Sequence, residues 1–268
     1  MTMVMFCRTD VGVSVIADTL FRANGRAGLE VGPKIFTVPI TVRTLGSGEL
    51  QRCLDMGFAF AGFTSAGQVT HAIAAAALQN LVGNEPHGIP SVRDVADYYA
   101  RCAVYVVNEM RRSVASDQFL FEGAVFGWED EEPIVFTFDV KIGDDAKATA
   151  PVEPMDFEKT LLYIIGDGFS HAQQRLWEIW ESGTKAKPHQ LLAAVIESSD
   201  VPSVGGSMQG ATITSRGVEL KPILWVDETG KATGGYMGAN IGQLGDVGGL
   251  FPVSDKPIVL PRSDLKRD

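Results

Sequence analysis

Residues 2–19 of this chain read TMVMFCRTDVGVSVIADT. Apolar and β-branched side chains fill residues 3–8 and 13–17, and the intervening Thr9-Asp10-Val11-Gly12 has the composition of a turn. We therefore expect two short β-strands that begin immediately after Thr2. The rest of the chain has to supply the neighbours of this strand pair.

Further strands and helices follow in an order that does not alternate singly. The hydrophobic periodicity predicts strands at 35–42, 58–61, 121–128, 134–140, 161–165, 210–214 and 218–226, and helices at 65–82, 91–112, 170–181 and 189–198. Residues 141–156 are polar and contain prolines, so we expect a surface loop there. Parallel α/β folds alternate strand and helix, which this pattern does not. Paired helices between runs of strands instead predict an α+β fold, a four-layer αββα sandwich.

The composition indicates one globular domain with a short extension. The chain has 268 residues, 45% of them hydrophobic and 21% charged, which is enough to bury a core. The tail is rich in glycine and lacks long apolar periodicity. We therefore predict an αββα domain over residues 1–229 and a Gly-rich C-terminal extension over 230–268.

The net charge and the cysteines limit the classes of binding partner and the cellular compartment. A net charge of −10 disfavours binding to nucleic acid or to an anionic membrane. No apolar run approaches the roughly 20 residues that span a bilayer. The three cysteines are far apart and form no CxxC pair, which favours a reducing environment. These features predict a soluble cytoplasmic protein.

Common catalytic and cofactor motifs are absent from the sequence. It contains no GxxxxGK[ST], no HExxH and no GxSxG. None of the four histidines (His71, His87, His171 and His189) falls within metal-ligand spacing of another. We therefore expect no metal site and no organic cofactor.

Thr2 is a candidate nucleophile. It directly follows Met1, and methionine aminopeptidase removes Met1 when the second residue is small. The product would begin with a threonine whose α-amine has an ordinary pKa of about 7.7–8.0. Such an amine can act as the general base for the hydroxyl of the same residue.

Residues downstream of Thr2 resemble the proteasome family of N-terminal nucleophile peptidases. This family includes proteasome β subunits, the ring-forming peptidase of the bacterial two-component ATP-dependent protease, and the ancestral-β-like bacterial peptidases. Gly12-Val13-Ser14-Val15-Ile16-Ala17-Asp18-Thr19 resembles the family's Gly-hydrophobic-Ala-Asp-Ser/Thr segment, with Asp18 sixteen positions after Thr2. Lys34 lies thirty-two positions after Thr2, again the family spacing.

Two further segments extend the resemblance to about residue 226. Ala61-Gly62 precedes an Ala-rich predicted helix and is similar to the family's oxyanion glycine and first helix. Asp200-Val201-Pro202-Ser203-Val204-Gly205-Gly206 resembles its Asp-x-x-Ser-Gly-Gly stretch. The sequence departs from the family at Gly166-Asp167-Gly168, where β subunits carry a serine between the glycines, and in an apparent insertion around residues 43–56.

The resemblance implies a threonine-type peptidase that forms a ring or a spiral of identical subunits. Thr2 would be the nucleophile, Lys34 held by Asp18 would supply positive potential, and the Gly62 N–H would stabilise the oxyanion. Asp200 and Ser203 would position the amine, whereas Asp167 could be either a turn residue or a catalytic acid. The substrate would be a peptide or unfolded protein, and an ATPase partner is not specified.

Two other functions remain open at this point. The chain could be an inactive structural ring subunit of the same fold, or an amide hydrolase for a small metabolite on that scaffold.

Overall fold

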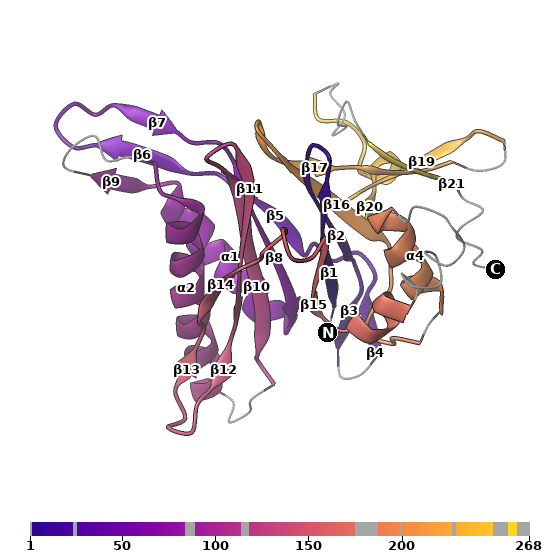
Figure 1. Cartoon of the computed structure of the whole chain (residues 1–268), viewed down its shortest axis with the longest axis horizontal. Coiled ribbons are helices and arrows are strands. Elements are labelled where there is room, and N and C mark those ends of the chain that lie inside the picture. The colour runs from indigo at the N-terminus through magenta and orange to yellow at the C-terminus, as the bar shows by residue number, and fades with distance from the viewer. Residues whose placement is uncertain are drawn as a thin grey trace.

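The computed structural model describes residues 2–23, 26–83, 89–113, 118–174, 187–198, 200–226, 229–248 and 257–261. Two five-stranded antiparallel sheets form its body (Figure 1). Sheet 1 has the order β15 (Leu162–Gly166), β1 (Met3–Thr9), β2 (Gly12–Asp18), β16 (Met208–Thr214) and β17 (Gly217–Lys221). Sheet 2 has the order β14 (Val152–Pro154), β11 (Glu132–Asp139), β10 (Phe121–Glu129), β8 (Met56–Gly62) and β5 (Ile35–Val38).

The expected strand pair at the N-terminus lies at the centre of sheet 1. β1 and β2 pair in the register Val4↔Ala17 to Thr9↔Gly12, so the turn falls where the sequence predicts it. Strands from far along the chain flank this pair, because β15 pairs with β1 and β16 pairs with β2. Alternate side chains of β1 and β2 point to opposite faces of the sheet, and both faces are buried.

The inner faces of the two sheets pack against each other. Their shared core contains side chains from both sheets, among them Phe6, Val15, Ala59 and Phe126. The rings of Phe6 and Phe126 meet edge to face with centroids 5.7 Å apart, a favourable arrangement for aromatic pairs. This contact joins β1 of sheet 1 to β10 of sheet 2.

Helices cover the outer faces unevenly. α1 (Thr64–Leu78) and α2 (Val92–Ser113) pack against sheet 2 around Tyr99, Phe58 and Phe60. α4 (Pro188–Ser198) packs against sheet 1 through Leu191, Leu192 and Val195. Residues 169–174 are also helical, whereas most of the helix predicted at 170–181 lies outside the described residues. A short helix, α5 (Ile241–Leu244), follows near the end of the chain.

Four smaller sheets occupy segments whose sequences predict loops, single strands or a tail. They pair β3 (Phe21–Ala23) with β4 (Arg26–Leu29), and β12 (Lys141–Ile142) with β13 (Ala148–Thr149). A third contains β7 (Leu50–Arg52), β6 (Thr41–Thr44) and β9 (Leu81–Gly83), and the fourth contains β20 (Ala239–Asn240), β19 (Ala232–Tyr236), β18 (Ile223–Val226) and β21 (Ile258–Pro261). The sheet of β6, β7 and β9 projects from the body beyond the N-terminal end of α2 (Figure 1).

The prediction of a four-layer αββα sandwich is therefore wrong. Strands account for 43% of the described residues and helices for only 26%, and several small sheets accompany the two large ones. The error arises because these short segments have no clear periodicity and form strands only by pairing with distant ones. β6, for example, pairs with β9, the short strand that follows α1.

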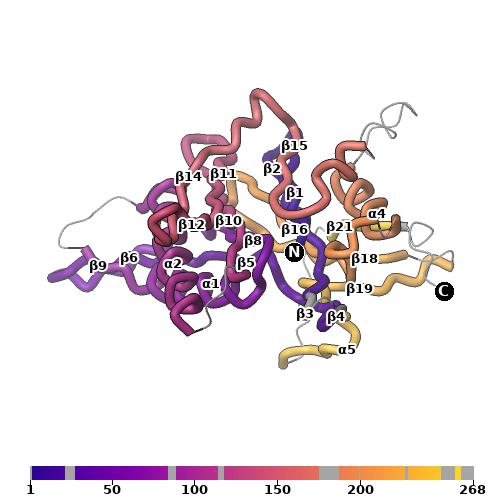
Figure 2. Tube along the Cα trace, turned by 90° about the horizontal axis from the view of Figure 1, so that it is seen from below, coloured from indigo at the N-terminus to yellow at the C-terminus, as the bar shows by residue number. Residues whose placement is uncertain are grey.

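The predicted boundary between residues 229 and 230 falls between two paired strands. β18 lies before it and β19 after it, and they form an antiparallel pair. β21 adds to the other side of β18, and Leu260 is buried in the core beside α4. Figure 2 shows these strands on the same side of β1 and β2 as α4. The division into a domain and an extension stays a prediction.

Candidate active site

Thr2 is buried between the start of β1 and the turn that follows β15. It is 2% exposed, and its carbonyl oxygen accepts a hydrogen bond of 2.9 Å from the backbone N–H of Asp167. Gly166, the last residue of β15, has φ +85°, and a Cβ there would lie 2.0 Å from the Thr2 carbonyl oxygen. The turn can approach Thr2 this closely only because residue 166 has no side chain.

Asp18 ends β2 beside Thr2 and is completely buried. Its Oδ1 accepts hydrogen bonds from the backbone N–H of Met3 at 3.0 Å and from Lys34 Nζ at 2.9 Å. Its Oδ2 accepts from the N–H groups of Leu20 at 3.2 Å and Gly205 at 3.1 Å. Burial raises the pKa of Asp18, and the Lys34 charge with these hydrogen bonds partly offsets that rise.

Lys34 reaches Asp18 from the segment that leads into β5 of sheet 2. Its side chain is completely buried, and Nζ also donates to the carbonyl of Leu20 at 2.8 Å. Nζ lies 5.5 Å from the centroid of the Phe21 ring. Burial lowers the pKa of Lys34, opposed by the neighbouring carboxylate of Asp18. Because Lys34 Nζ and Met3 N share Oδ1, the lysine lies directly beside the peptide that follows Thr2.

Gly62 ends β8 of sheet 2 on the same side of the molecule. Its φ is +115°, and an added Cβ would lie 2.8 Å from Phe121 Cα, so the backbone conformation there requires glycine. The preceding Ala61 side chain approaches the Gly166 turn, because a Cβ on Gly166 would lie 2.6 Å from that of Ala61. The end of β8 and Thr2 therefore meet the same turn.

The two distal residues proposed to position the amine behave differently. The Ser203 hydroxyl donates a short hydrogen bond to the carboxylate of Asp167, in the Gly166-Asp167-Gly168 turn. Asp200 is exposed and follows α4, where its backbone N–H donates to the Ser198 hydroxyl at 3.3 Å. The structure thus brings Ser203 to Asp167, whose backbone N–H is bonded to Thr2. The catalytic roles of all these residues stay predictions.

Sequence reasoning missed two polar residues near this group. Glu122 of β10 accepts from the Gly166 N–H at 3.3 Å, and burial raises its pKa. Gln209 of β16 is 2% exposed and bonds to backbone groups around Asp18 and Lys34. A long polar side chain within a buried strand was the available signal for Gln209.

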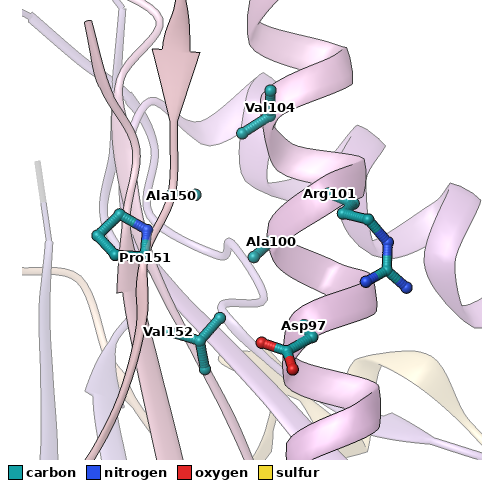
Figure 3. Close-up of a pocket in the computed structure, with 7 residues that line it drawn as sticks. All are labelled: Asp97, Ala100, Arg101, Val104, Ala150, Pro151 and Val152. Carbon is teal, nitrogen blue, oxygen red and sulfur yellow. The ribbon is translucent and has the colours of Figure 1, made fainter. Parts of the chain in front are cut away.

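A separate cavity of about 430 Å³ lies between α2 and residues 150–152. Ala100 and Val104 of the helix face Ala150 and Val152 across it (Figure 3). None of the predicted site residues lines it.

Within the described parts of the chain, no cluster of three or more His, Cys, Asp or Glu residues could hold a metal ion. No described helix combines the length and apolar character needed to cross a membrane.

Comparison with known proteins finds relatives by structure alone. No protein-family model matches the chain, and no curated protein matches it. An Anbu (Gly-1) mutant from Hyphomicrobium sp. strain MC1 superposes with a TM-score of 0.55 at 14% identity, over 89% of this chain and 88% of that one. The chain shares the fold of an Anbu subunit. The Anbu complex of Pseudomonas aeruginosa, described as a helical assembly, gives a TM-score of 0.54 at 15% identity, over 80% and 81% of the two chains.

These comparisons correct the assignment to the proteasome family of N-terminal nucleophile peptidases. Anbu subunits are the structural neighbours, and at 14–15% identity the likeness establishes the fold alone. Among the described residues, strands also outweigh helices, which does not single out that family. The family assignment was wrong because it depended on a few short motifs, each weak by itself.

Proposed function

We propose that this chain is a hydrolase of peptide bonds that uses Thr2 as its nucleophile after Met1 has been removed. The observation that carries the proposal is the buried ion pair beside Thr2. Lys34 Nζ and the backbone N–H of Met3 donate to the same oxygen of Asp18, at 2.9 and 3.0 Å. A fully buried lysine is costly to maintain unless its charge is used or compensated, and here it adjoins a potential nucleophile.

The proposed reaction has two stages. The Thr2 hydroxyl attacks the substrate carbonyl while the Thr2 α-amine takes up its proton through a water molecule, and the departing amine of the substrate receives a proton. An ester between Thr2 and the acyl part of the substrate forms. Water then attacks this ester, releases the carboxylic acid and restores the threonine hydroxyl.

The surrounding residues have distinct roles in this scheme. The positive charge of Lys34 disfavours the protonated amine and so lowers its pKa. The N–H of Gly62 stabilises the oxyanion. Ser203 and Asp167, which are hydrogen-bonded to each other, orient the amine, whereas Asp200 is exposed and has no part in this scheme. Glu122 and Asp167 place negative charge at the Gly166-Asp167-Gly168 turn, which favours the protonated Thr2 amine and so opposes the lowering of its pKa by Lys34.

We further propose that the chain acts as a homo-oligomer, either a ring or a spiral. The support is the structural likeness to the Anbu complex, which is described as a helical assembly. Light scattering of the purified protein at micromolar concentration should give a mass that is a multiple of the 28.8 kDa chain. A monomer under these conditions contradicts this part of the proposal.

The nucleophile is tested by intact-mass analysis combined with substitution. The active protein should lack Met1, Thr2→Ala should abolish cleavage of fluorogenic peptides, and Thr2→Ser should keep part of the rate. Thr9→Ala, at the opposite end of β1, is the matched control and should cleave normally. Cleavage by Thr2→Ala at the normal rate, or full activity with Met1 retained, excludes Thr2 as the nucleophile.

Two results would favour the other functions. An assembled protein with free Thr2 that cleaves no peptide in a broad library is a structural subunit. Hydrolysis of small amides without peptide cleavage identifies a metabolite hydrolase.

A further inference from the structure

Gln209 joins the two sheets at the level of the Lys34–Asp18 ion pair. It lies in β16 of sheet 1, opposite Ala17 of β2. Its side chain extends to the segment that leads into β5, the edge strand of sheet 2. The ion pair spans the same gap, because Asp18 ends β2 and Lys34 precedes β5.

The Gln209 amide uses all of its hydrogen-bonding capacity in this position. Oε1 accepts from the backbone N–H groups of Lys34 at 3.0 Å and Ile35 at 3.1 Å. Nε2 donates to the carbonyl oxygens of Asp18 at 3.2 Å and Gly32 at 3.3 Å. A glutamine amide has two donor hydrogens and two acceptor lone pairs, so every one is paired. The side chain is 2% exposed, so water has little access to replace these bonds.

These four bonds act on the backbone that carries both charged residues. Without Gln209, the backbone N–H groups of Lys34 and Ile35 would lose their shared acceptor, Oε1. The carbonyl of Asp18 and the N–H of Lys34 are tied to one rigid planar group. Their separation is therefore set by the dimensions of a single amide.

We propose that Gln209 is a positioning residue that holds the Lys34 ammonium where its charge acts on the Thr2 amine. The inference rests on the proposed function of Thr2. Gln209 touches neither the substrate nor the reacting atoms in this scheme. It acts through Lys34, and its loss changes where the positive charge lies rather than whether it exists.

The decisive variant is Gln209→Met, which keeps the side-chain length and removes all four hydrogen bonds without adding charge. We expect kcat/KM to fall about a hundredfold, the size of effect that a displacement of about 1 Å produces. The acidic limb of the kcat/KM profile should shift to higher pH, because a displaced Lys34 lowers the amine pKa less. Gln209→Asn, which keeps the amide but has a shorter reach, replaces it if Gln209→Met does not fold. Gln51→Asn in the exposed strand β7 is the control and should match the wild type.

A second measurement follows the amine without requiring catalysis. The pH dependence of acetylation of the Thr2 α-amine by acetic anhydride, read by mass spectrometry, reports its pKa in any folded variant. Gln209→Met should raise this pKa in the same direction as Lys34→Met. Reduced activity with an unchanged pH profile and unchanged amine pKa would overturn the proposal and leave Gln209 a purely structural residue. Wild-type activity in Gln209→Met overturns it as well.

The two measurements separate this proposal from the proposed function. If the wild type cleaves no peptide but both substitutions raise the amine pKa, the hydrolase assignment fails and the role of Gln209 stands. If the wild type cleaves peptides and Lys34→Met raises the amine pKa but Gln209→Met does not, the hydrolase assignment stands and the role of Gln209 fails.

Discussion

Lys34 and Asp18 form a fully buried ion pair between two different sheets. Neither side chain has exposed surface, and Lys34 Nζ lies 2.9 Å from Asp18 Oδ1. Removing both charges from water is costly, and their attraction offsets this cost only while each has its partner. Asp18 also accepts from three backbone N–H groups, whereas Lys34 Nζ has one further hydrogen bond, to the Leu20 carbonyl, so a lone carboxylate there would keep more stabilisation than a lone ammonium.

Breaking this pair should cost stability as well as activity. Lys34→Ala leaves the Asp18 carboxylate buried without its counter-charge, and we expect a loss of about 3–5 kcal/mol in the free energy of unfolding. The double variant Lys34→Met with Asp18→Asn should be more stable than Lys34→Ala. Urea unfolding of both variants checks this. Equal destabilisation in the two would show that the unpaired charge is not the cause.

The same substitution should change the pH dependence of the reaction. In the wild type we expect the acidic limb of the pH–rate profile below about 7.7–8.0, the ordinary pKa of an α-amine. Lys34→Ala removes a positive charge that disfavours the protonated amine, so the limb should move to higher pH. The profile of kcat/KM from pH 5 to 9 is the measurement. A limb that stays in place separates Lys34 from the chemistry of Thr2.

Asp167 and Asp200 can be distinguished by the same substitution at each. The Asp167 carboxylate accepts from Ser203 and its N–H holds the Thr2 carbonyl, whereas Asp200 is exposed. We expect Asp167→Asn and Ser203→Ala to lower the rate at least tenfold, and Asp200→Asn to change it less than twofold, since exposed substitutions without buried contacts have small effects. A large loss in Asp200→Asn alone would show that Asp200, rather than Asp167, acts with Ser203 on the amine, as the sequence resemblance implies.

Gly166 should tolerate no side chain. Gly166→Ala would place Cβ 2.0 Å from the Thr2 carbonyl oxygen at φ +85°. We expect a destabilisation of about 2–3 kcal/mol and loss of activity. Gly46→Ala is the control, because Gly46 has a similar φ of +92° but nothing within 4 Å of the added Cβ. The difference between their thermal unfolding midpoints isolates the clash from the backbone strain, and equal midpoints contradict the predicted clash.

The free energy of unfolding should depend on pH through His71. Its ring lies in α1 against Phe36 and Phe58, its Nδ1 is 3.0 Å from the Tyr99 hydroxyl, and burial lowers its pKa to about 4. Between pH 6.5 and 4 the unfolded chain binds a proton at this residue that the folded chain does not. Stability should therefore fall as the pH decreases through this window, by up to about 3 kcal/mol from this residue.

His71→Gln keeps a hydrogen-bonding group near Tyr99 and does not titrate. The free energy of unfolding of the wild type should decrease more between pH 6.5 and 4 than that of His71→Gln. Urea titrations at several pH values give this comparison. Parallel decreases in the two proteins would show that the protonation of His71 is not coupled to unfolding.

The N-terminal strands were predictable because their signals are local. Two strand-like runs, residues 3–8 and 13–17, lie on either side of a turn, and the structure has β1 and β2 there. Proline accounts for two smaller differences. The predicted strand 35–42 divides at Pro39 into β5 and β6, and 218–226 divides at Pro222 into β17 and β18, since proline cannot donate to a strand ladder.

The polar contacts of the candidate site depend on pairings that periodicity does not encode. Asp167 and Ser203 are 36 positions apart in loops, and Gln209 reaches Lys34 over 175 positions. The proximity of Asp18 and Lys34 was expected from a resemblance rather than from any property of the intervening sequence. β14 likewise forms only by pairing with β11, in a segment whose prolines favour a loop.

The strand order of sheet 1 determines when this site can exist during synthesis. Asp18 and Gln209 are separated by 191 positions, and a ribosome that adds about 5–20 residues per second needs about 10–40 s to cover that length. During this interval β1 lacks its neighbour β15 until residue 166 has been added, and β2 lacks its neighbour β16 throughout, so the strand pair has free edges that are available to chaperones or to other nascent chains. A prematurely terminated chain would carry Thr2, Asp18 and Lys34 but not the residues that bring them together. A chain that ends before residue 209 therefore lacks the amide that bonds to the backbone of both Asp18 and Lys34.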